Sequence, residues 1–148
     1  MEIVKYKSKM KAGYEKANVK TARYHMVGDF DGVKAFIDTV GYPVVIKPDN
    51  GVGASDTWKI TCDDELNEFW SQKRNVQYIC EEFVPGHIET FDGITDKDCN
   101  ILFCTGQVLC VSPMDMMHGA GENISYTQNV QAATDLYEAG QRVVKAFN

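Results

Sequence analysis

The pattern of apolar and polar positions predicts several helices in the first half of the chain. Apolar residues at i, i+3, i+4 and i+7 over 33–40 predict an amphipathic helix. Asp29 or Asp31 is placed to cap its start, and Gly41 to end it. Two more helices are predicted, over residues 6–17 and from a capping-box-like stretch at 61–64 to Lys73 and Arg74.

Strand patterns surround a glycine-rich loop. The β-branched run 44–46 predicts a short strand covered on both faces, and it ends at Lys47. A loop with two glycines follows at 50–55, and the residues 57–61 then alternate as in a second strand. We therefore expect a hairpin with the glycine loop at its tip.

The second half of the chain reads as an antiparallel meander. Strands are predicted at 76–84, 87–94, 101–104 and 107–112, with turns at 95–100 and 105–106. Residues 112–129 carry no clear pattern, and a last helix is predicted over 130–147. The expected fold class is α+β, with two lobes, 1–75 and 76–148.

Composition limits the classes of partner. The chain of 148 residues carries a formal charge of −6, which argues against binding to nucleic acid or to an anionic membrane. Its five cysteines include no Cys-x-x-Cys pair, so we expect reduced thiols in a reducing, cytoplasmic compartment. A zinc site at Cys99, Cys104 and Cys110 is the minor alternative. No apolar run approaches the roughly 20 residues of a membrane span.

Two lysines are candidates for anion binding. Lys47 ends an apolar strand, where a charge is costly to bury unless an anion meets it. The amides of a loop containing Gly51 and Gly53 can form an anion-binding nest beside it. Lys7 joins this site only if the fold brings the start of the first helix to the glycine loop. The alternative for Lys7 is a solvated lysine among its lysine neighbours.

The segment between the lobes has two interpretations. It consists of Glu81, Glu82, Phe83 and Val84, followed by Pro-Gly. Either it is an edge strand with its acids in water, or it is a hinge whose backbone binds an adenine edge. In the second case Glu89 or His87 is placed to bond ribose hydroxyls.

Two other phosphate-binding classes are excluded by motif order. In protein kinases the glycine loop precedes the strand lysine, whereas here it follows Lys47, and His-Arg-Asp is absent. A Walker P-loop needs Lys-Ser or Lys-Thr after its glycines, and this chain has neither there.

Taken together, these blocks resemble the ATP-grasp superfamily. The matching segments are Lys7 with Met10 and 17–19; 42–48 with Gly51, Gly53, Ala54 and Ser55; and 81–86 with 87–93. The resemblance implies ATP between two α+β lobes, with Lys7 and Lys47 on the phosphates, the loop amides over them and the 81–84 segment on adenine. It also implies Mg²⁺ and a ligase that activates a carboxylate as an acylphosphate for an amine, as in carbamoyl-phosphate synthetase large chains or D-alanine ligases.

The chain departs from this family at the metal site. The only Glu-x-Asn motif, at 65–67, lies in a predicted helix, away from the family's late strands. We therefore expect a fragment with a truncated C-terminal lobe, catalytically incomplete, whose Mg²⁺ ligands lie elsewhere and whose exposed surface favours self-association. A non-catalytic nucleotide-binding or interaction module is the alternative. Residues 114–121 are either an acceptor pocket or a mobile loop.

Overall fold

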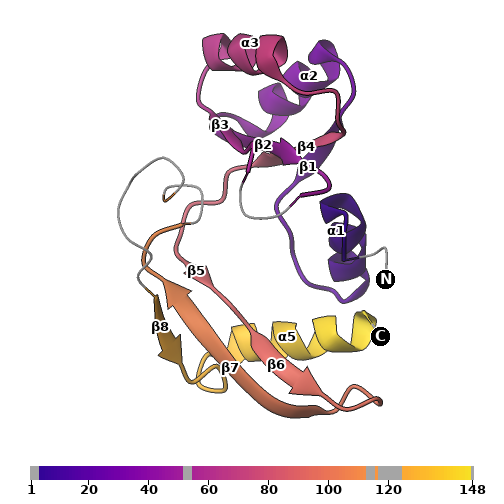
Figure 1. Cartoon of the computed structure of the whole chain (residues 1–148), viewed down its shortest axis with the longest axis vertical. Coiled ribbons are helices and arrows are strands. Elements are labelled where there is room, and N and C mark those ends of the chain that lie inside the picture. The colour runs from indigo at the N-terminus through magenta and orange to yellow at the C-terminus, as the bar shows by residue number, and fades with distance from the viewer. Residues whose placement is uncertain (1–3, 52–54, 113–115, 117–124, 148) are drawn as a thin grey trace. The chain divides into compact units, whose positions relative to one another are not determined.

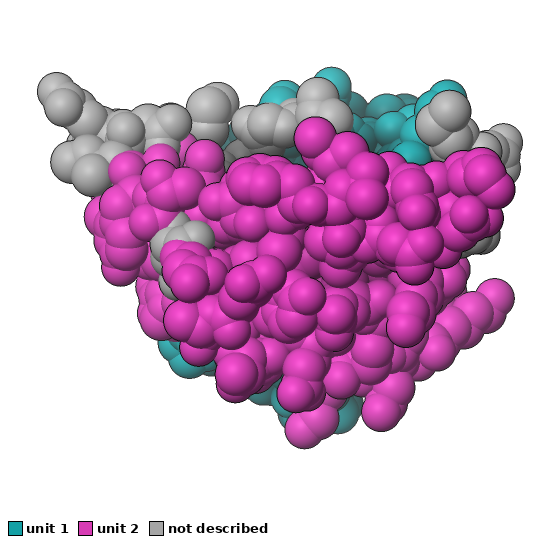
Figure 2. Space-filling model, turned by 90° about the horizontal axis from the view of Figure 1, so that it is seen from below, with its two compact units in different colours: residues 1–10, 21–85 teal, residues 11–20, 86–148 magenta. Residues whose placement is uncertain are grey.

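The chain is divided into two compact units. A computed structural model describes residues 4–51, 55–112, 116 and 125–147. Met1–Met10 and Thr21–Pro85 form the first unit, and Lys11–Lys20 and Gly86–Asn148 form the second (Figure 2). The boundary expected near residue 75 falls inside the first unit, because the strand that follows it is hydrogen-bonded within the first sheet.

The first unit contains one four-stranded antiparallel sheet and its helices (Figure 1). The elements are α1 (Lys7–Lys16, whose residues from Lys11 on belong to the second unit), β1 (Tyr24–Val27), α2 (Phe30–Val40), β2 (Val44–Pro48), β3 (Trp58–Ile60), α3 (Asp63–Gln72) and β4 (Tyr78–Glu82). The strand order is β1-β4-β2-β3. β2 and β3 form the hairpin predicted around the glycine loop.

One face of this sheet is packed against α2 and α3. The helices contribute Val33 and Ile37 from α2, and Leu66 and Phe69 from α3, to a single buried core. The strands contribute Val27, Val44, Ile46, Ile60, Tyr78 and Cys80. In β2, Val44 and Ile46 are buried, whereas Val45 and Lys47 are only partly buried. The expectation of a strand covered on both faces therefore holds in part, since the side of β2 that faces α2 and α3 is buried and the other side is partly buried.

The helix ends agree with the sequence at α2 and differ at α3. Asp29 caps α2 by accepting a hydrogen bond from the Gly32 amide at 2.7 Å, and Gly41 follows α2 with φ of 82°. At α3, the Glu65 carboxylate accepts hydrogen bonds from the amide and hydroxyl of Thr61, at 2.6 and 2.8 Å. The capping interaction thus uses a residue one position later than the predicted Asp64.

The second unit is built around a long strand. Its elements are β5 (Ile88–Glu89), β6 (Asp92–Thr95), β7 (Ile101–Leu109), β8 (Ser125–Gln128) and α5 (Thr134–Ala146). β7 is hydrogen-bonded to the other three strands, each antiparallel. The hairpin turn predicted at 95–100 is confirmed, since the Asp96 amide donates to the Asn100 carbonyl at 3.0 Å. The turn predicted at 105–106 is wrong, because Gly106 pairs with Gln128 and β7 continues through it.

None of the helices in the described part of the chain is long and apolar enough to span a membrane.

Candidate functional site

The face of the first sheet opposite its helices carries a lysine–glutamate pair. Val45 lies opposite Glu81 in the pairing of β2 with β4, and Lys47 lies opposite Ile79. Because side chains alternate along a strand, all four project to the face away from the α2–α3 core. The Lys47 Nζ lies 2.5 Å from a Glu81 carboxylate oxygen, with side chains 25% and 11% exposed. Each charge is therefore compensated by the other in this partly buried setting.

Asp49 attaches the start of α1 to the end of β2. Its carboxylate accepts hydrogen bonds from the Ser8 amide and the Ser8 hydroxyl, both at 2.8 Å. Its carbonyl accepts the Lys7 amide at 3.0 Å, and its own amide donates to the Gln77 carbonyl at 2.9 Å. Asp49 is only 4% exposed. An acidic residue at a helix N-terminus compensates the unpaired amides and the positive end of the helix dipole.

This attachment places the Lys7 side chain at the base of the glycine loop. The Lys7 ammonium donates to the carbonyls of Pro48 at 2.8 Å and Gly51 at 3.0 Å, with a longer contact of 3.5 Å to that of Asp49. Lys7 is thus held by the loop, and the alternative of a solvated surface lysine is wrong. Desolvation and then the nearby Lys47 charge lower the pKa of Lys7, although Asp49 and Glu81 oppose this shift.

Four charged groups therefore gather where β2 enters the loop. Lys7 and Lys47 are close enough for their charges to repel, and Asp49 and Glu81 act on Lys7 with the opposite sign. Two ammonium groups and two carboxylates leave this cluster formally neutral. Such a cluster can bind an anion if Lys7 releases the loop carbonyls and Lys47 releases Glu81, so that both ammonium groups contact the anion instead.

The other end of the glycine loop is held by Asp56. One carboxylate oxygen accepts from Trp58 Nε1 at 3.0 Å. The other accepts from the Tyr78 hydroxyl at 2.5 Å and from Arg74 Nε and Nη2 at 2.9 and 2.7 Å. Desolvation acts to raise the pKa of Asp56, but the hydrogen bonds from Tyr78, Trp58 and Arg74 together lower it.

Asp56 and Arg74 were missed as partners by sequence reasoning. The helix predicted to reach Lys73 and Arg74 ends at Gln72, and Arg74 binds Asp56 instead. No periodicity links an aspartate in a loop to an arginine so distant in the chain. Of the predicted loop residues, Gly51 and Ser55 are exposed, whereas Gly53 and Ala54 lie outside the described residues.

The segment from Glu81 to Val84 continues a central strand. β4 lies between β1 and β2, so the edge-strand alternative is wrong. The carboxylate of Glu82 accepts hydrogen bonds from the backbone amide of Arg23 at 2.7 Å and from Arg23 Nε at 2.6 Å.

The backbone donors of this segment are partly occupied. The Glu82 amide donates to the Arg23 carbonyl at 3.0 Å, and the Phe83 amide donates to the Pro43 carbonyl at 3.3 Å. Val84 is 64% exposed, and within the described residues its amide has no hydrogen-bond acceptor. Among the described residues, Val84 thus differs from Glu82 and Phe83, whose amides donate within the first unit.

The two candidates for binding the ribose, His87 and Glu89, are residues of the second unit. Glu89 belongs to β5 of the second unit, where its carboxylate lies 2.7 Å from His87 Nε2. The described residues contain no group of three or more His, Cys, Asp or Glu side chains placed to hold a metal ion. All five cysteines are free thiols. Of the segment 114–121, only Met116 is described.

A curated protein resembles part of the chain. No family model matches the chain. Over 94 residues it is 29% identical to a formate-dependent phosphoribosylglycinamide formyltransferase of Synechococcus sp. (strain CC9605), a match that covers 59% of this chain and 24% of that protein. The matched region thus spans about a quarter of the length of this curated relative.

Solved structures resemble nearly the whole chain. N5-carboxyaminoimidazole synthetase from Staphylococcus aureus, complexed with ADP, superposes with a TM-score of 0.75 at 14% identity, over 98% of this chain and 38% of that one. The ATP-grasp ligase PsnB, complexed with a minimal precursor, Mg and ADP, superposes with a TM-score of 0.67 at 14% identity, over 96% of this chain and 42% of that one. The chain therefore has the ATP-grasp fold, of which it spans a part.

Proposed function

We propose that this chain is the ATP-binding segment of an ATP-dependent ligase that activates a carboxylate as an acylphosphate. The observation that carries the proposal is the meeting of Lys7 and Lys47 at the base of the glycine loop, in a fold shared with ligases solved with ADP. The activity and substrates of the whole protein are part of the proposal, since the chain spans less than half of those structures.

In this proposal the two lysines bind the phosphates. Lys47 exchanges Glu81 for a phosphate oxygen, and Lys7 exchanges loop carbonyls for another. The loop amides of Gly51, Gly53, Ala54 and Ser55 supply further donors. Because phosphoryl transfer depends mainly on positioning and charge compensation, ammonium groups and amides are suitable for this role.

The hinge binds the base. The Val84 amide donates to a ring nitrogen of adenine, while the partly buried side chain of Val45 contacts the ring. Glu81, Glu82 and Phe83 hold this segment in place through the contacts described above.

The reaction itself proceeds in two transfers. A carboxylate oxygen of the substrate attacks the γ-phosphorus of ATP, the bond to the bridging oxygen breaks and ADP leaves. An amine then attacks the acyl carbon and inorganic phosphate leaves. Bound Mg²⁺ would neutralise phosphate charge. Asp49 and Glu81, the acids beside the lysines, are engaged with Ser8 and Lys47, and the described residues contain no group of three or more His, Cys, Asp or Glu side chains placed to hold this ion.

The test measures binding of MgATP and of adenosine by isothermal titration calorimetry. Lys47→Met keeps the length of the side chain and removes its charge, so we expect MgATP affinity to fall at least about tenfold while adenosine affinity changes little. Lys97→Met, at a site 88% exposed in the second unit, is the matched control and should leave both affinities unchanged.

Two results would overturn the proposal. One is a wild-type chain with no saturable MgATP binding at millimolar concentration. The other is a folded Lys47→Met variant that binds MgATP as tightly as wild type. Because Lys47→Met leaves Glu81 without this partner, Lys7→Met serves as a second charge-removing variant, with folding checked by the unfolding transition.

A further inference from the structure

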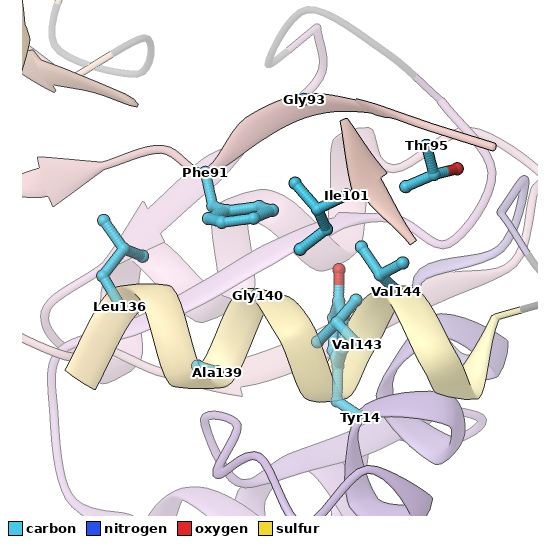
Figure 3. Close-up of a pocket in the computed structure, with 10 residues that line it drawn as sticks. All are labelled: Tyr14, Phe91, Gly93, Thr95, Ile101, Leu136, Ala139, Gly140, Val143 and Val144. Carbon is cyan, nitrogen blue, oxygen red and sulfur yellow. The ribbon is translucent and has the colours of Figure 1, made fainter. Parts of the chain in front are cut away.

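The second unit contains a cavity that the proposed nucleotide site does not use. Its volume is about 410 Å³, and it lies between α5, the β6–β7 strands and the part of α1 that belongs to this unit (Figure 3). The α5 side is formed by Leu136, Ala139, Gly140, Val143 and Val144. Phe91, Gly93, Thr95, Ile101 and Tyr14 complete the lining.

A close contact between the walls fixes one boundary of the cavity. A Cβ atom built on Gly140 would lie 2.5 Å from the ring of Phe91, so only glycine lets the helix approach this ring so closely. Glycine within a helix costs about 1 kcal/mol relative to alanine. The close approach of Phe91 is a packing reason for a glycine at this position. Gly140 is buried and Thr95 is exposed, so the cavity extends from the surface to the helix.

The lining defines the chemistry of a ligand. None of the lining residues is charged, and the side chains that form most of it are aliphatic or aromatic. The exceptions are the hydroxyl groups of Tyr14 and Thr95, and neither has a hydrogen-bond partner within the described part of the chain. Figure 3 shows the Tyr14 side chain directed from α1 toward the space between α5 and the strands.

We propose that this cavity binds a small uncharged molecule with an apolar body and one hydroxyl group, of the phenol class. Its volume lies in the range of ligand pockets, which combine mostly apolar walls with a few polar groups. Water is poorly held by walls with so few hydrogen-bonding groups. An ionised ligand would lose its hydration without gaining a counter-charge. The hydroxyl of a phenol can instead pair with Tyr14 or Thr95.

The test compares p-cresol with toluene, two probes that differ by one hydroxyl. Titrations of the full 148-residue chain, followed by protein NMR chemical shifts, should show saturable binding of both, with p-cresol tighter. Tyr14→Phe should reduce the preference for p-cresol about fivefold or more while toluene still binds, because it removes one hydroxyl partner and no cavity wall. This readout is independent of ATP, so its failure would not bear on the nucleotide site.

A pair of alanine variants provides the control. Ala139→Leu fills the cavity and should abolish binding of both probes, whereas Ala146→Leu, at an exposed position of the same helix, should leave binding unchanged. The proposal fails if wild type binds neither probe, or if a folded Ala139→Leu variant binds both as wild type does. If wild type binds neither probe and Ala139→Leu raises the melting temperature, the cavity is only a gap in the packing that leucine fills.

Discussion

The hydroxyl of Tyr78 offers a sharp test of how the glycine loop is held. Tyr78 is 1% exposed, donates to Asp56 at 2.5 Å and accepts from the Arg74 amide at 3.2 Å. Tyr78→Phe removes the hydroxyl but keeps the ring, which packs edge-on against Phe69 with centroids 5.3 Å apart. A buried hydrogen bond to a charged group contributes about 1.5–3 kcal/mol. We therefore expect the free energy of unfolding to fall by about 2 kcal/mol at pH 7.

A second tyrosine provides a matched control. Tyr42 also donates to an aspartate, at 2.6 Å, but its acceptor Asp63 is 60% exposed and binds Lys34 as well. Tyr42→Phe should lower stability by about 0.5 kcal/mol or less, because water replaces a lost surface hydrogen bond. Urea unfolding followed by the fluorescence of Trp58 and Trp70 reports on this unit, since both pack against its core.

The effect of Tyr78→Phe should also depend on pH. The pKa of Asp56 is lowered in the folded chain, so its ionised form stabilises the fold above the ordinary carboxyl pKa of about 4. This contribution is lost as the pH falls through the folded pKa. The difference between wild type and Tyr78→Phe should therefore narrow below about pH 4. Equal losses in the two tyrosine variants at pH 7, or a difference independent of pH, would refute the reasoning.

Two further predictions concern a helix cap and a buried thiol. Asp29→Ala removes the capping hydrogen bond of α2 and should lower the free energy of unfolding, measured in urea, by about 1 kcal/mol. Asp31→Ala removes a charge from the first turn but no capping bond, so it should lower the free energy of unfolding by only about 0.3 kcal/mol. Burial raises the pKa of Cys80 to about 12. Iodoacetamide at pH 8 followed by peptide mapping should find the exposed Cys62 and Cys110 alkylated well before Cys80; equal rates in the native protein would contradict this burial.

Local pattern was sufficient for much of the fold. The apolar stripe, the capping aspartate and the terminal glycine together define α2, and each acts within a few residues. The hairpin was predictable for the same reason, since two alternating runs flank a loop with glycines. By contrast, the Thr-Gly pair at 105–106 is a local turn signal that pairing with β8 overrides. Strand pairing between distant segments is not visible in a local window.

At the candidate site, too, the residues that local pattern marks could be predicted, whereas their distant partners could not. Lys47 was identifiable because a charge at the end of an apolar strand is unusual, and Lys7 because it matched a family pattern. The pairing of Lys47 with Glu81 depends on the register of β2 with β4, and the contacts of Asp56 depend on residues 18 and 22 positions away. Sequence reasoning identified the residue types at the site but not which partners compensate their charges.

The role of Asp49 has a consequence for any attempt to shorten this protein. A version that begins at residue 11 would lack the Ser8 amide and hydroxyl, which donate to the carboxylate of Asp49, and the Lys7 amide, which donates to its carbonyl. Water would then have to replace all three of these donors, and the contact that joins α1 to the end of β2 would be lost. Trimming at the N-terminus would therefore weaken the strand end that carries Lys47, even though every residue of the sheet itself were retained.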